Sequence, residues 1–436
     1  MALAEPGGLL VAAPRSGSGK TVVTLGLLAA LKARGLAVAP AKSGPDYIDT
    51  AILERAAGRA AVNLDPWAMA PSRLKSLAAS HTADADLLLV EGVMGLFDGA
   101  ADGTGSTGDL AAALGLPLVL VVDAERQGQS IAALVSGFAN WRADIRVAGV
   151  ILNRVASTRH ERMLVAALSE TGITCLGVIP RDSGLALPER HLGLVLPDEA
   201  TSFETVVGRA GEVVADYVDL GRVLELAAPL ASAEPRPLRL APLGQRIAIA
   251  RDRAFAFLYR HMLDDWRAAG AELSFFSPLA DEAPAPDADA VFLPGGYPEL
   301  HGSALSAASN FRAGLLAARD RGALVYGECG GFMVLGEVLF DKAGVPHEMV
   351  GLLPVITRID RPKRTLGYRR LAHQSPLPWP GRLMGHEFHY SSVKQTRLTP
   401  LFAATDTLGE PLPPMGAVEG RVMGSYAHVI DAPAMA

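Results

Sequence analysis

The N-terminal half of the chain alternates between short apolar runs and longer amphipathic stretches. Short apolar runs are typical of strands buried inside a sheet, and the longer stretches are typical of helices that cover it. Strands that alternate with helices predict an α/β domain with a mostly parallel sheet and flanking helices. The predicted strands are residues 8–13, 36–41, 86–90, 117–123, 147–152 and 173–179.

A second α/β pattern begins after residues 226–245, an Ala/Pro-rich stretch without clear periodicity. Such a stretch predicts a domain linker. The pattern beyond it predicts strands at 246–250, 290–293 and 323–326 and helices at 255–269 and 332–339. We therefore expect two domains, residues 1–225 and 246–436.

Composition narrows the class of protein. The chain has 436 residues and a net charge of -6, so no global basic field indicates nucleic acid as a partner. Its two cysteines, Cys175 and Cys329, argue against a disulfide framework and fit a reducing cytoplasm. The longest strongly apolar run, Leu116–Val122, is far shorter than a membrane span, and Met1–Gly8 lacks the basic region of a secretion signal. We expect a cytoplasmic protein without a membrane partner, and Cys175 in its core.

The first predicted strand runs directly into a phosphate-binding loop. Residues 14–21 read Pro-Arg-Ser-Gly-Ser-Gly-Lys-Thr and precede leucines at helical spacing. In such a loop the backbone N–H groups surround phosphates, the lysine reaches the β- and γ-phosphates, and the threonine binds magnesium. Pro14 replaces the usual first glycine, which indicates a longer loop with Ala13 as the small residue. The predicted nucleotide-binding residues are Ser16, Gly17, Ser18, Gly19, Lys20, Thr21 and Asn153.

Asn153 ends a later strand, and two interpretations of it stay open: it reads the adenine edge, or it is a simple strand-end turn. Acidic residues follow two other strands. Asp46 lies in the stretch 42–49, and Glu91 ends a strand of the Walker B form. Loops beyond strand ends line the ligand crevice of open α/β sheets, and magnesium prefers oxygen ligands.

We therefore predict Thr21, Asp46 and Glu91 as magnesium ligands. Lys42, Tyr47 and Asp98 are the predicted substrate contacts. The Gly/Ser/Thr-rich residues 99–108 are either a mobile substrate cover or a plain flexible connection.

The second domain carries a candidate nucleophile in Gly327–Gly331, which reads Gly-Glu-Cys-Gly-Gly. A strand, a tight turn and a helix lift such a nucleophile out of the sheet. At a helix N-terminus the pKa of a thiol is expected to fall. A buried structural cysteine is the alternative interpretation of Cys329. The flanking glycine pairs and the distant His428 favour catalysis.

His428 is the preferred base because it follows a short strand-like stretch near the C-terminus. His386 and His389 compete with it, and spacing alone does not exclude them. A Gly-Gly pair ends the strand at 290–293 and can present backbone N–H groups to an oxyanion. The predicted oxyanion donors are the N–H groups of Gly296 and Gly330.

Several motifs in a common order resemble one known family. Residues 13–21, 42–49 and 91–99 resemble the cobyrinic/hydrogenobyrinic acid a,c-diamide synthases, and the N-terminal part is also similar to dethiobiotin synthetase. The C-terminal part resembles a class I glutamine amidotransferase of the type attached to corrinoid amidases. Its matching segments are residues 294–299, 327–331 and 385–391.

The resemblance implies an α/β fold of two domains, a P-loop synthetase and a class I glutamine amidotransferase. It implies a ligase that uses ATP, Mg²⁺ and glutamine to amidate the a and c carboxylates of a tetrapyrrole in cobalamin biosynthesis, and a homodimer. The Ala/Arg-rich composition favours metal-free hydrogenobyrinic acid over cobyrinic acid. The chain departs from the class I pattern in one place: the glutamate two residues after the catalytic histidine is Ile430, followed by Asp431. A Cys329–His428 dyad is implied, and the group that orients His428 stays open.

Three alternatives remain. Two of them are enzymes, a nickel-sirohydrochlorin a,c-diamide synthase and a cobyric acid synthase. The non-enzyme alternative is a P-loop switch protein of the chromosome-partition type, because Arg15 lies where such proteins carry a second basic residue.

Overall fold

The computed structural model describes the chain in two compact units, Met1–Arg236 and Pro237–Ala436. The boundary between the units falls inside the stretch 226–245 that the sequence predicts as a linker. The structure describes all residues except 1–5, 187–188, 191–192, 195–196, 198–201, 231–237, 396–398 and 434–436.

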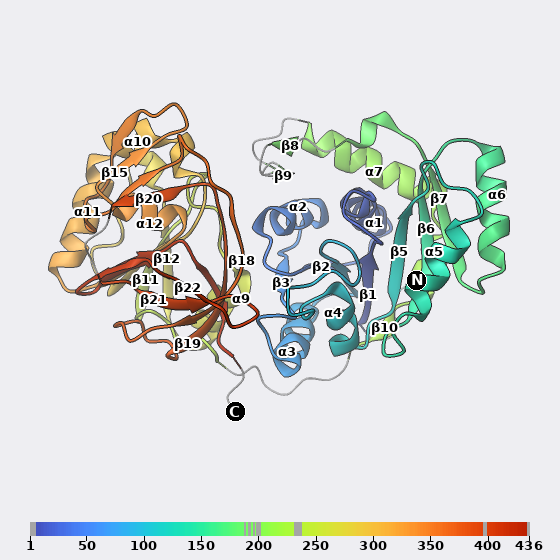
Figure 1. The fold of residues 1–436 in the computed structure, drawn as a ribbon, viewed down its shortest axis with the longest axis horizontal. Helices are drawn as coiled ribbons and strands as arrows, with labels where there is room; N and C mark the ends of the chain where they lie inside the picture. Colours follow the sequence, from blue (N-terminus) through green and yellow to red (C-terminus); the bar gives the residue numbers. More distant parts are fainter. Residues whose placement is uncertain are drawn as a thin grey trace. The chain divides into compact units, whose positions relative to one another are not determined.

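The first unit is built on one large sheet (Figure 1). Its described strands run in the order β3-β2-β4-β1-β5-β6-β7, all parallel, and β10 adds an antiparallel pair to β1. The inner strands are buried along their whole length, as expected for a parallel sheet covered by helices on both faces. The strands are β1 (Gly7–Ala12), β2 (Val38–Ser43), β3 (Val62–Leu64), β4 (Leu87–Glu91), β5 (Leu118–Asp123), β6 (Val147–Val155), β7 (Thr174–Pro180) and β10 (Ala228–Pro229), with a separate hairpin of β8 (Glu189–Arg190) and β9 (Gly193–Leu194).

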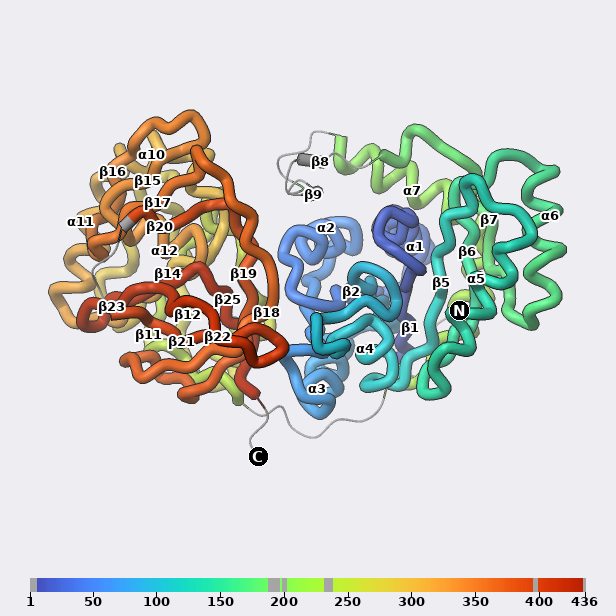
Figure 2. Tube along the Cα trace, in the orientation of Figure 1, coloured from blue at the N-terminus to red at the C-terminus, as the bar shows by residue number. Residues whose placement is uncertain are grey.

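Helices connect these strands, and two of them pack closely against each other. A Cβ on Gly26 would lie 2.6 Å from the carbonyl oxygen of Ala210, and one on Gly211 would lie 2.8 Å from the Cβ of Ala29. The two glycines therefore allow the backbones of α1 and α7 to approach closely (Figure 2). The helices of this unit are α1 (Lys20–Ala33), α2 (Tyr47–Ala57), α3 (Pro71–His81), α4 (Thr107–Leu114), α5 (Ile131–Asn140), α6 (Thr158–Ser169), α7 (Phe203–Tyr217) and α8 (Leu220–Glu225).

The second unit contains a six-stranded sheet in the order β12-β11-β13-β14-β24-β23, parallel except for β23. A five-stranded sheet, β22-β21-β18-β19-β25, and a four-stranded sheet, β16-β15-β17-β20, complete the described part of this unit. The strands of the main sheet are β11 (Arg246–Ala250), β12 (Glu272–Phe276), β13 (Ala290–Leu293), β14 (Leu324–Glu328), β23 (Ala417–Glu419) and β24 (Val422–Ser425).

The strands of the two smaller sheets are β15 (Val338–Phe340), β16 (Pro346–Glu348), β17 (Ile356–Arg358), β18 (Thr365–Ala372), β19 (Arg382–His389), β20 (Ser392–Gln395), β21 (Phe402–Thr405), β22 (Pro411–Met415) and β25 (His428–Asp431). The helices of this unit are α9 (Arg260–Ala268), α10 (Gly302–Ala307), α11 (Ser309–Asp320) and α12 (Gly330–Leu335). The core of the unit gathers Val291, Leu293, Phe311, Leu315, Val325 and Phe332 from β13, α11, β14 and α12.

Two predicted helices of this unit are shorter than expected. The helix predicted at 255–269 begins only at Arg260, because the N–H of Phe257 donates to the carbonyl of Gly295 and holds the preceding chain extended. The helix predicted at 332–339 ends at Leu335, and its last residues form β15 instead. Apolar residues alone do not distinguish a short buried helix from a short buried strand.

Cys175 is only partly buried, so its predicted core position is wrong. It lies on β7, the last strand of the sheet, where the burial of successive residues is incomplete. No helix among the described residues is long and apolar enough to cross a membrane.

The close packing of β13 and α12 yields a first testable prediction. A Cβ on Gly331 would lie 1.9 Å from the carbonyl oxygen of Leu293, so a side chain there forces one of the two backbones to shift. Overpacking of this kind costs about 1–3 kcal/mol, so we expect Gly331→Ala to lower the melting temperature by roughly 2–12 °C. Differential scanning calorimetry measures the change.

Gly137→Ala is the matched control. Gly137 is exposed within α5, and no atom lies within 4 Å of the position that a Cβ would take, so alanine gains about 1 kcal/mol of helix propensity. A Gly331→Ala protein that melts with the unmodified protein would contradict the packing described here.

Candidate functional site

The loop between β1 and α1 has the backbone shape of a phosphate cradle. Gly17 and Gly19 adopt φ values of 80° and 87°, a region that favours glycine. Gly19 caps α1 without a side-chain hydrogen bond, which leaves the first N–H groups of the helix available to an anion. The predicted residues Ser16 to Thr21 therefore lie together at one helix N-terminus.

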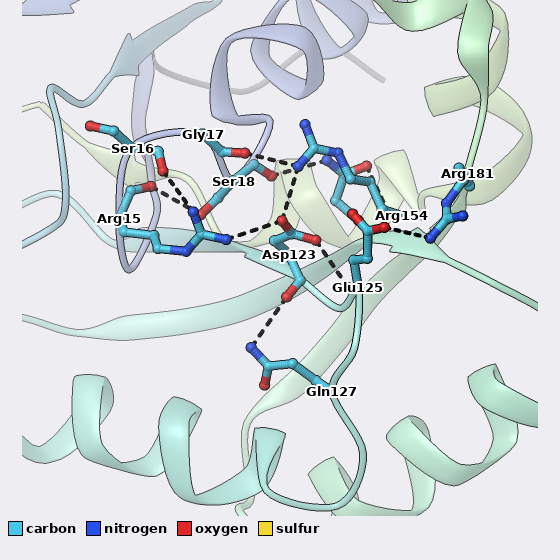
Figure 3. A network of polar contacts seen from close by, with 10 residues as sticks. Arg15, Ser16, Gly17, Ser18, Asp123, Glu125, Gln127, Arg154 and Arg181 are labelled. Carbon is cyan, nitrogen blue, oxygen red and sulfur yellow. Dashed lines mark hydrogen bonds and ion pairs between the residues drawn. The ribbon is translucent and has the colours of Figure 1, made fainter.

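The carboxyl ends of β5 and β6 hold this cradle (Figure 3). The amide nitrogen of Asn153 donates to the carbonyl of Ser18 at 3.0 Å. Arg154 donates from Nη1 to the carbonyl of Gly17 and to Asp123 Oδ2, both at 2.9 Å. Its φ of 59° shows that the backbone is turned to aim the guanidinium back at the loop.

These contacts show that Asn153 connects the end of β6 to the phosphate-binding loop. Its Oδ1 accepts the backbone N–H of Arg154, and its amide nitrogen holds the loop. A Cβ on Gly19 would collide with this amide at 2.1 Å. Adenine recognition by Asn153 stays a prediction. Arg154 and Asp123 had no predicted role, because only the fold brings β5 and β6 to the loop.

A buried lysine cluster adjoins the cradle. Lys42 is almost fully buried, and its Nζ contacts Asp49 Oδ2 at 2.5 Å and Glu91 Oε1 at 3.1 Å. Burial opposes the charge of Lys42, but Asp49, Glu91 and Asp46 outweigh it and raise its pKa. Burial and nearby Lys42 lower the pKa of Lys20 instead. Asp49 lies in the predicted stretch 42–49 but was assigned no role there.

The predicted magnesium ligands meet a structural test. The Thr21 hydroxyl donates to Glu91 Oε1 at 2.7 Å, and Glu91 Oε2 is buried without a hydrogen-bond partner. Asp46 accepts the N–H of Asp49 as the N-cap of α2. Burial and the neighbouring Asp49 raise the pKa of Asp46 to about 7. An orphaned carboxylate oxygen and an excess of acidic groups fit a divalent cation.

In the described part of the chain, no group of three or more His, Cys, Asp or Glu side chains is placed to hold a metal ion. A magnesium ion held by Thr21, Glu91 and Asp46 would therefore take its remaining ligands from phosphates and water, as this ion commonly does.

The other two predicted substrate contacts lie on neighbouring loops of the first unit. Tyr47 is the first residue of α2 and is partly exposed. Asp98 is exposed, and its Oδ2 accepts the N–H of Gly95 at 2.9 Å. The loop that carries Asp98 is tied to the start of the cradle, because the N–H of Leu96 donates to the carbonyl of Ala13.

In the second unit, Cys329 occupies a strained turn between β14 and α12. Its φ of 47° and ψ of −106° are rare for a residue with a side chain. The N–H of Cys329 donates to the carbonyl of Ser425 at 2.8 Å, and its carbonyl accepts the N–H of Met333. Strain of this kind is common where a nucleophile is presented from a strand end.

The predicted oxyanion donors come together beside this turn. A Cβ on Gly330 would lie 3.1 Å from the backbone nitrogen of Gly296, so the two N–H groups belong to one small region. A Cβ on Gly296 would collide with the carbonyl of Ala254 at 2.1 Å. Only glycine therefore fits here, and the bridge between Phe257 and Gly295 fixes the loop.

The structure brings His428 to Cys329. A Cβ on Gly295 would lie 3.2 Å from both His428 Nε2 and Cys329 Cβ. The competing histidines have other surroundings. His386 packs edge-on against the ring of His428 at 5.1 Å, and His389 stacks on Tyr426 and contacts Glu387.

Burial favours the neutral form of both reactive groups. Burial, followed by the charge of Glu299, raises the pKa of the Cys329 thiol to about 12. Burial, followed by His389, lowers the pKa of His428 to about 3. The prediction that a helix N-terminus lowers the thiol pKa is therefore wrong for this structure. Desolvation outweighs the influence of the six-residue α12.

The fold and the two sites define a class: a P-loop nucleotide-binding domain joined to a glutamine amidotransferase domain. Residues 9–195 match the CobQ/CobB/MinD/ParA nucleotide binding domain, and residues 246–434 match the CobB/CobQ-like glutamine amidotransferase domain.

Relatives named hydrogenobyrinate a,c-diamide synthase match nearly the whole chain. Those of Brucella abortus biovar 1 and Rhizobium meliloti are each 54% identical over 97% of this chain, covering 98% and 99% of the relative. That of Rhodobacter capsulatus is 50% identical over 98% of this chain and 99% of the relative. The chain belongs to the family of hydrogenobyrinate a,c-diamide synthases, glutamine-dependent carbon–nitrogen ligases, which confirms the predicted resemblance and excludes the partition-type switch.

The contacts of Arg154 with the cradle yield a second prediction. Arg154→Ala removes the bonds to Gly17 and Asp123, and we expect the Kd for ATP to rise about tenfold, equivalent to about 1.4 kcal/mol. Isothermal titration calorimetry measures it. Arg181→Ala is the matched control, because Arg181 pairs with Glu125 in the same network but not with the loop. An equal rise of the Kd for ATP in both variants would contradict a role of the Arg154 contacts in holding the loop.

Proposed function

We propose that this protein amidates the a and c side-chain carboxylates of hydrogenobyrinic acid in cobalamin biosynthesis, with ATP and with glutamine as the amide donor. The observation that carries the proposal is the agreement of whole-chain relatives with that name and two sites of the matching chemistry. We assign the synthetase to residues 1–225 and the glutaminase to residues 246–436. Composition and family resemblance support a cytoplasmic homodimer.

A carboxylate is a poor acyl donor, and phosphorylation by ATP converts it into an acyl phosphate with a good leaving group. In the synthetase, the N–H groups of the loop and the Nζ of Lys20 bind the phosphates. Lys42 keeps its charge between Asp49 and Glu91, so it offers a fixed cation at the same strand edge. Tyr47 and Asp98 contact the macrocycle.

Thr21, Glu91 and Asp46 would hold magnesium, which neutralises phosphate charge when bound. The buried orphan oxygen of Glu91 supports this assignment. The raised pKa of Asp46 supports it as well, because a cation would stabilise the ionised carboxylate there.

In the glutaminase, Cys329 attacks the side-chain amide of glutamine. The thiol proton moves to Nε2 of His428 as the sulfur–carbon bond forms, because both groups are neutral beforehand. The oxyanion accepts hydrogen bonds from the N–H groups of Gly296 and Gly330. His428 then donates its proton to the leaving nitrogen, and water hydrolyses the thioester. The released ammonia displaces phosphate from the acyl phosphate.

Because glutamine hydrolysis and amide synthesis are assigned to different domains, Cys329→Ala should affect only synthesis that uses glutamine. Without the thiol, glutamine-dependent synthesis should fall by at least about 1,000-fold, while synthesis with added ammonium salt stays near the unmodified rate. Product formation with either nitrogen source is measured by chromatography. Retained use of glutamine by the variant would contradict the assignment of Cys329 as the nucleophile.

Glu91→Gln and Asp46→Asn should show the opposite split. Each removes charge from the phosphate site, and synthesis should fall about 100-fold or more with either nitrogen source, since such electrostatic effects are several kcal/mol. Glutaminase activity, measured as glutamate release, should persist. Equal loss of both activities would argue against two separate sites.

A mass-spectrometric amidation assay tests the substrate. Hydrogenobyrinic and cobyrinic acids are offered separately with ATP, Mg²⁺ and glutamine. The proposal predicts a product of hydrogenobyrinic acid in which two carboxyl hydroxyls are replaced by amino groups. No product from this acid, with glutaminase activity intact, would move the substrate elsewhere.

A further inference from the structure

The histidine of the glutaminase needs an orienting partner that the class I pattern does not supply here. The usual glutamate position is Ile430, and Asp431 follows it. A register irregularity between β19 and β25 falls between His428 and Asp431, so simple alternation does not place the Asp431 side chain, whose Oδ1 accepts the N–H of Ala432. Asp431 is therefore the competing acid on β25, and the test has to distinguish it from any other carboxylate beside His428.

The structure places a different carboxylate at the ring of His428. Glu328 Oε2 lies 3.8 Å from His428 Nδ1, and both side chains are almost fully buried. The opposite edge of the ring, with Nε2, lies toward Cys329. Thiol, imidazole and carboxylate therefore occur in the order that a catalytic triad requires.

We propose that Glu328 is the positioning residue of this glutaminase, holding His428 in the tautomer that accepts the thiol proton. The inference rests on the proposed function of Cys329 and His428. Glu328 directly precedes the nucleophile in the sequence, so the end of β14 and the turn after it supply both outer members of the triad. This arrangement differs from the class I pattern, in which the carboxylate follows the histidine by two residues.

The remaining contacts of Glu328 hold its carboxylate in place. Oε1 accepts the Tyr326 hydroxyl at 3.0 Å and the N–H of Val429 at 3.1 Å. Both are donors to the carboxylate, and they leave Oε2 directed at the imidazole. Val429 follows His428, so the same carboxylate also fixes the backbone of the base.

Only the ionised form of Glu328 is suited to this task. A carboxylate accepts the proton of His428 Nδ1–H and leaves the lone pair of Nε2 free for the thiol proton. A protonated carboxyl would donate to Nδ1 instead and place the ring proton on Nε2, where it blocks the transfer. When the thiol proton reaches Nε2, the carboxylate stabilises the imidazolium without taking a proton itself.

Glutaminase activity should therefore increase with pH as Glu328 ionises. Burial raises the pKa of Glu328 to about 8, against the opposing bonds from Val429 and Tyr326. The titratable groups around the pair are Tyr326 and Cys329 next to Glu328, His386, Glu387 and His389 on β19, and His428 itself. His428 stays neutral across this range because burial lowers its pKa to about 3.

The test compares Glu328→Gln with the unmodified enzyme. The substitution keeps the shape of the side chain but removes its charge, and the new amide can donate to Nδ1, which selects the wrong tautomer. We expect glutamine-dependent kcat to fall roughly 100- to 10,000-fold. The KM for glutamine and the ammonia-dependent synthesis should stay within about threefold, because the phosphate site is untouched. The rise in kcat near pH 8 should vanish.

Two further variants separate positioning from structure. Tyr326→Phe removes one hydrogen bond that favours the ionised carboxylate, so the midpoint of the pH profile should shift upward while full activity returns at higher pH. Asp431→Asn, the alternative acid on β25, should keep both rate and midpoint. If Glu328→Gln fails to fold, seen as lost ammonia-dependent synthesis, the Tyr326→Phe midpoint carries the test.

Three results would overturn the proposal: near-normal glutamine use in Glu328→Gln, an unchanged midpoint in Tyr326→Phe, or a loss in Asp431→Asn that matches the expected loss in Glu328→Gln. None of these depends on the assignment of Cys329. Failure of the proposed function itself would appear separately, as glutamine use that survives in Cys329→Ala.

Discussion

The carboxyl edge of a parallel sheet is the constraint on which both reactive sites depend. In the first unit, β1 delivers the phosphate loop, β2 delivers Lys42 and β4 delivers Glu91 to one edge. In the second unit, β13, β14 and β24 deliver the Gly295–Gly296 turn, the Glu328–Cys329 pair and the chain that leads to His428. Parallel register brings these groups together although they are far apart in sequence.

Burial decides the electrostatics at both edges. In the phosphate site, the ion pairs with Asp49 and Glu91 outweigh the effect of burial, so Lys42 keeps its positive charge. In the glutaminase site, burial has the larger effect. The thiol of Cys329, the imidazole of His428 and the carboxyl group of Glu328 all favour their neutral forms near neutral pH. Once Glu328 is ionised, the next charge appears when the proton leaves the thiol. A dry site strengthens every hydrogen bond formed to that charge.

The sequence predicted the parts of this structure that local chemistry determines. The Gly-Ser-Gly-Lys-Thr loop requires left-handed glycines before a helix, and Gly17 and Gly19 have that shape. Six strands of the first unit and both parts of the family resemblance were also predicted, whereas the short strands β3 and β10 were not. Hydrophobic periodicity is less specific over short segments, and the helix expected at 332–339 divides into α12 and β15.

Other features depend on contacts between distant segments. Arg154 reaches Gly17 only because β6 lies near β1 in the sheet, and Glu328 reaches His428 only because β14 pairs with β24. The expected fall in the thiol pKa of Cys329 failed for the same reason: the burial that reverses it comes from the tertiary fold. Contacts between residues that are far apart in sequence cannot be predicted from the spacing of residues in a single sequence.

The central claim is that one chain couples a glutaminase to a phosphate-activating synthetase. The most direct measurement supplies glutamine labelled with ¹⁵N in its amide, without added ammonium, and analyses the diamide product by mass spectrometry. The account predicts that both new amides carry ¹⁵N, because the ammonia that reacts comes from glutamine hydrolysed at Cys329. Product amides without ¹⁵N, formed while the labelled glutamine is hydrolysed, would contradict it.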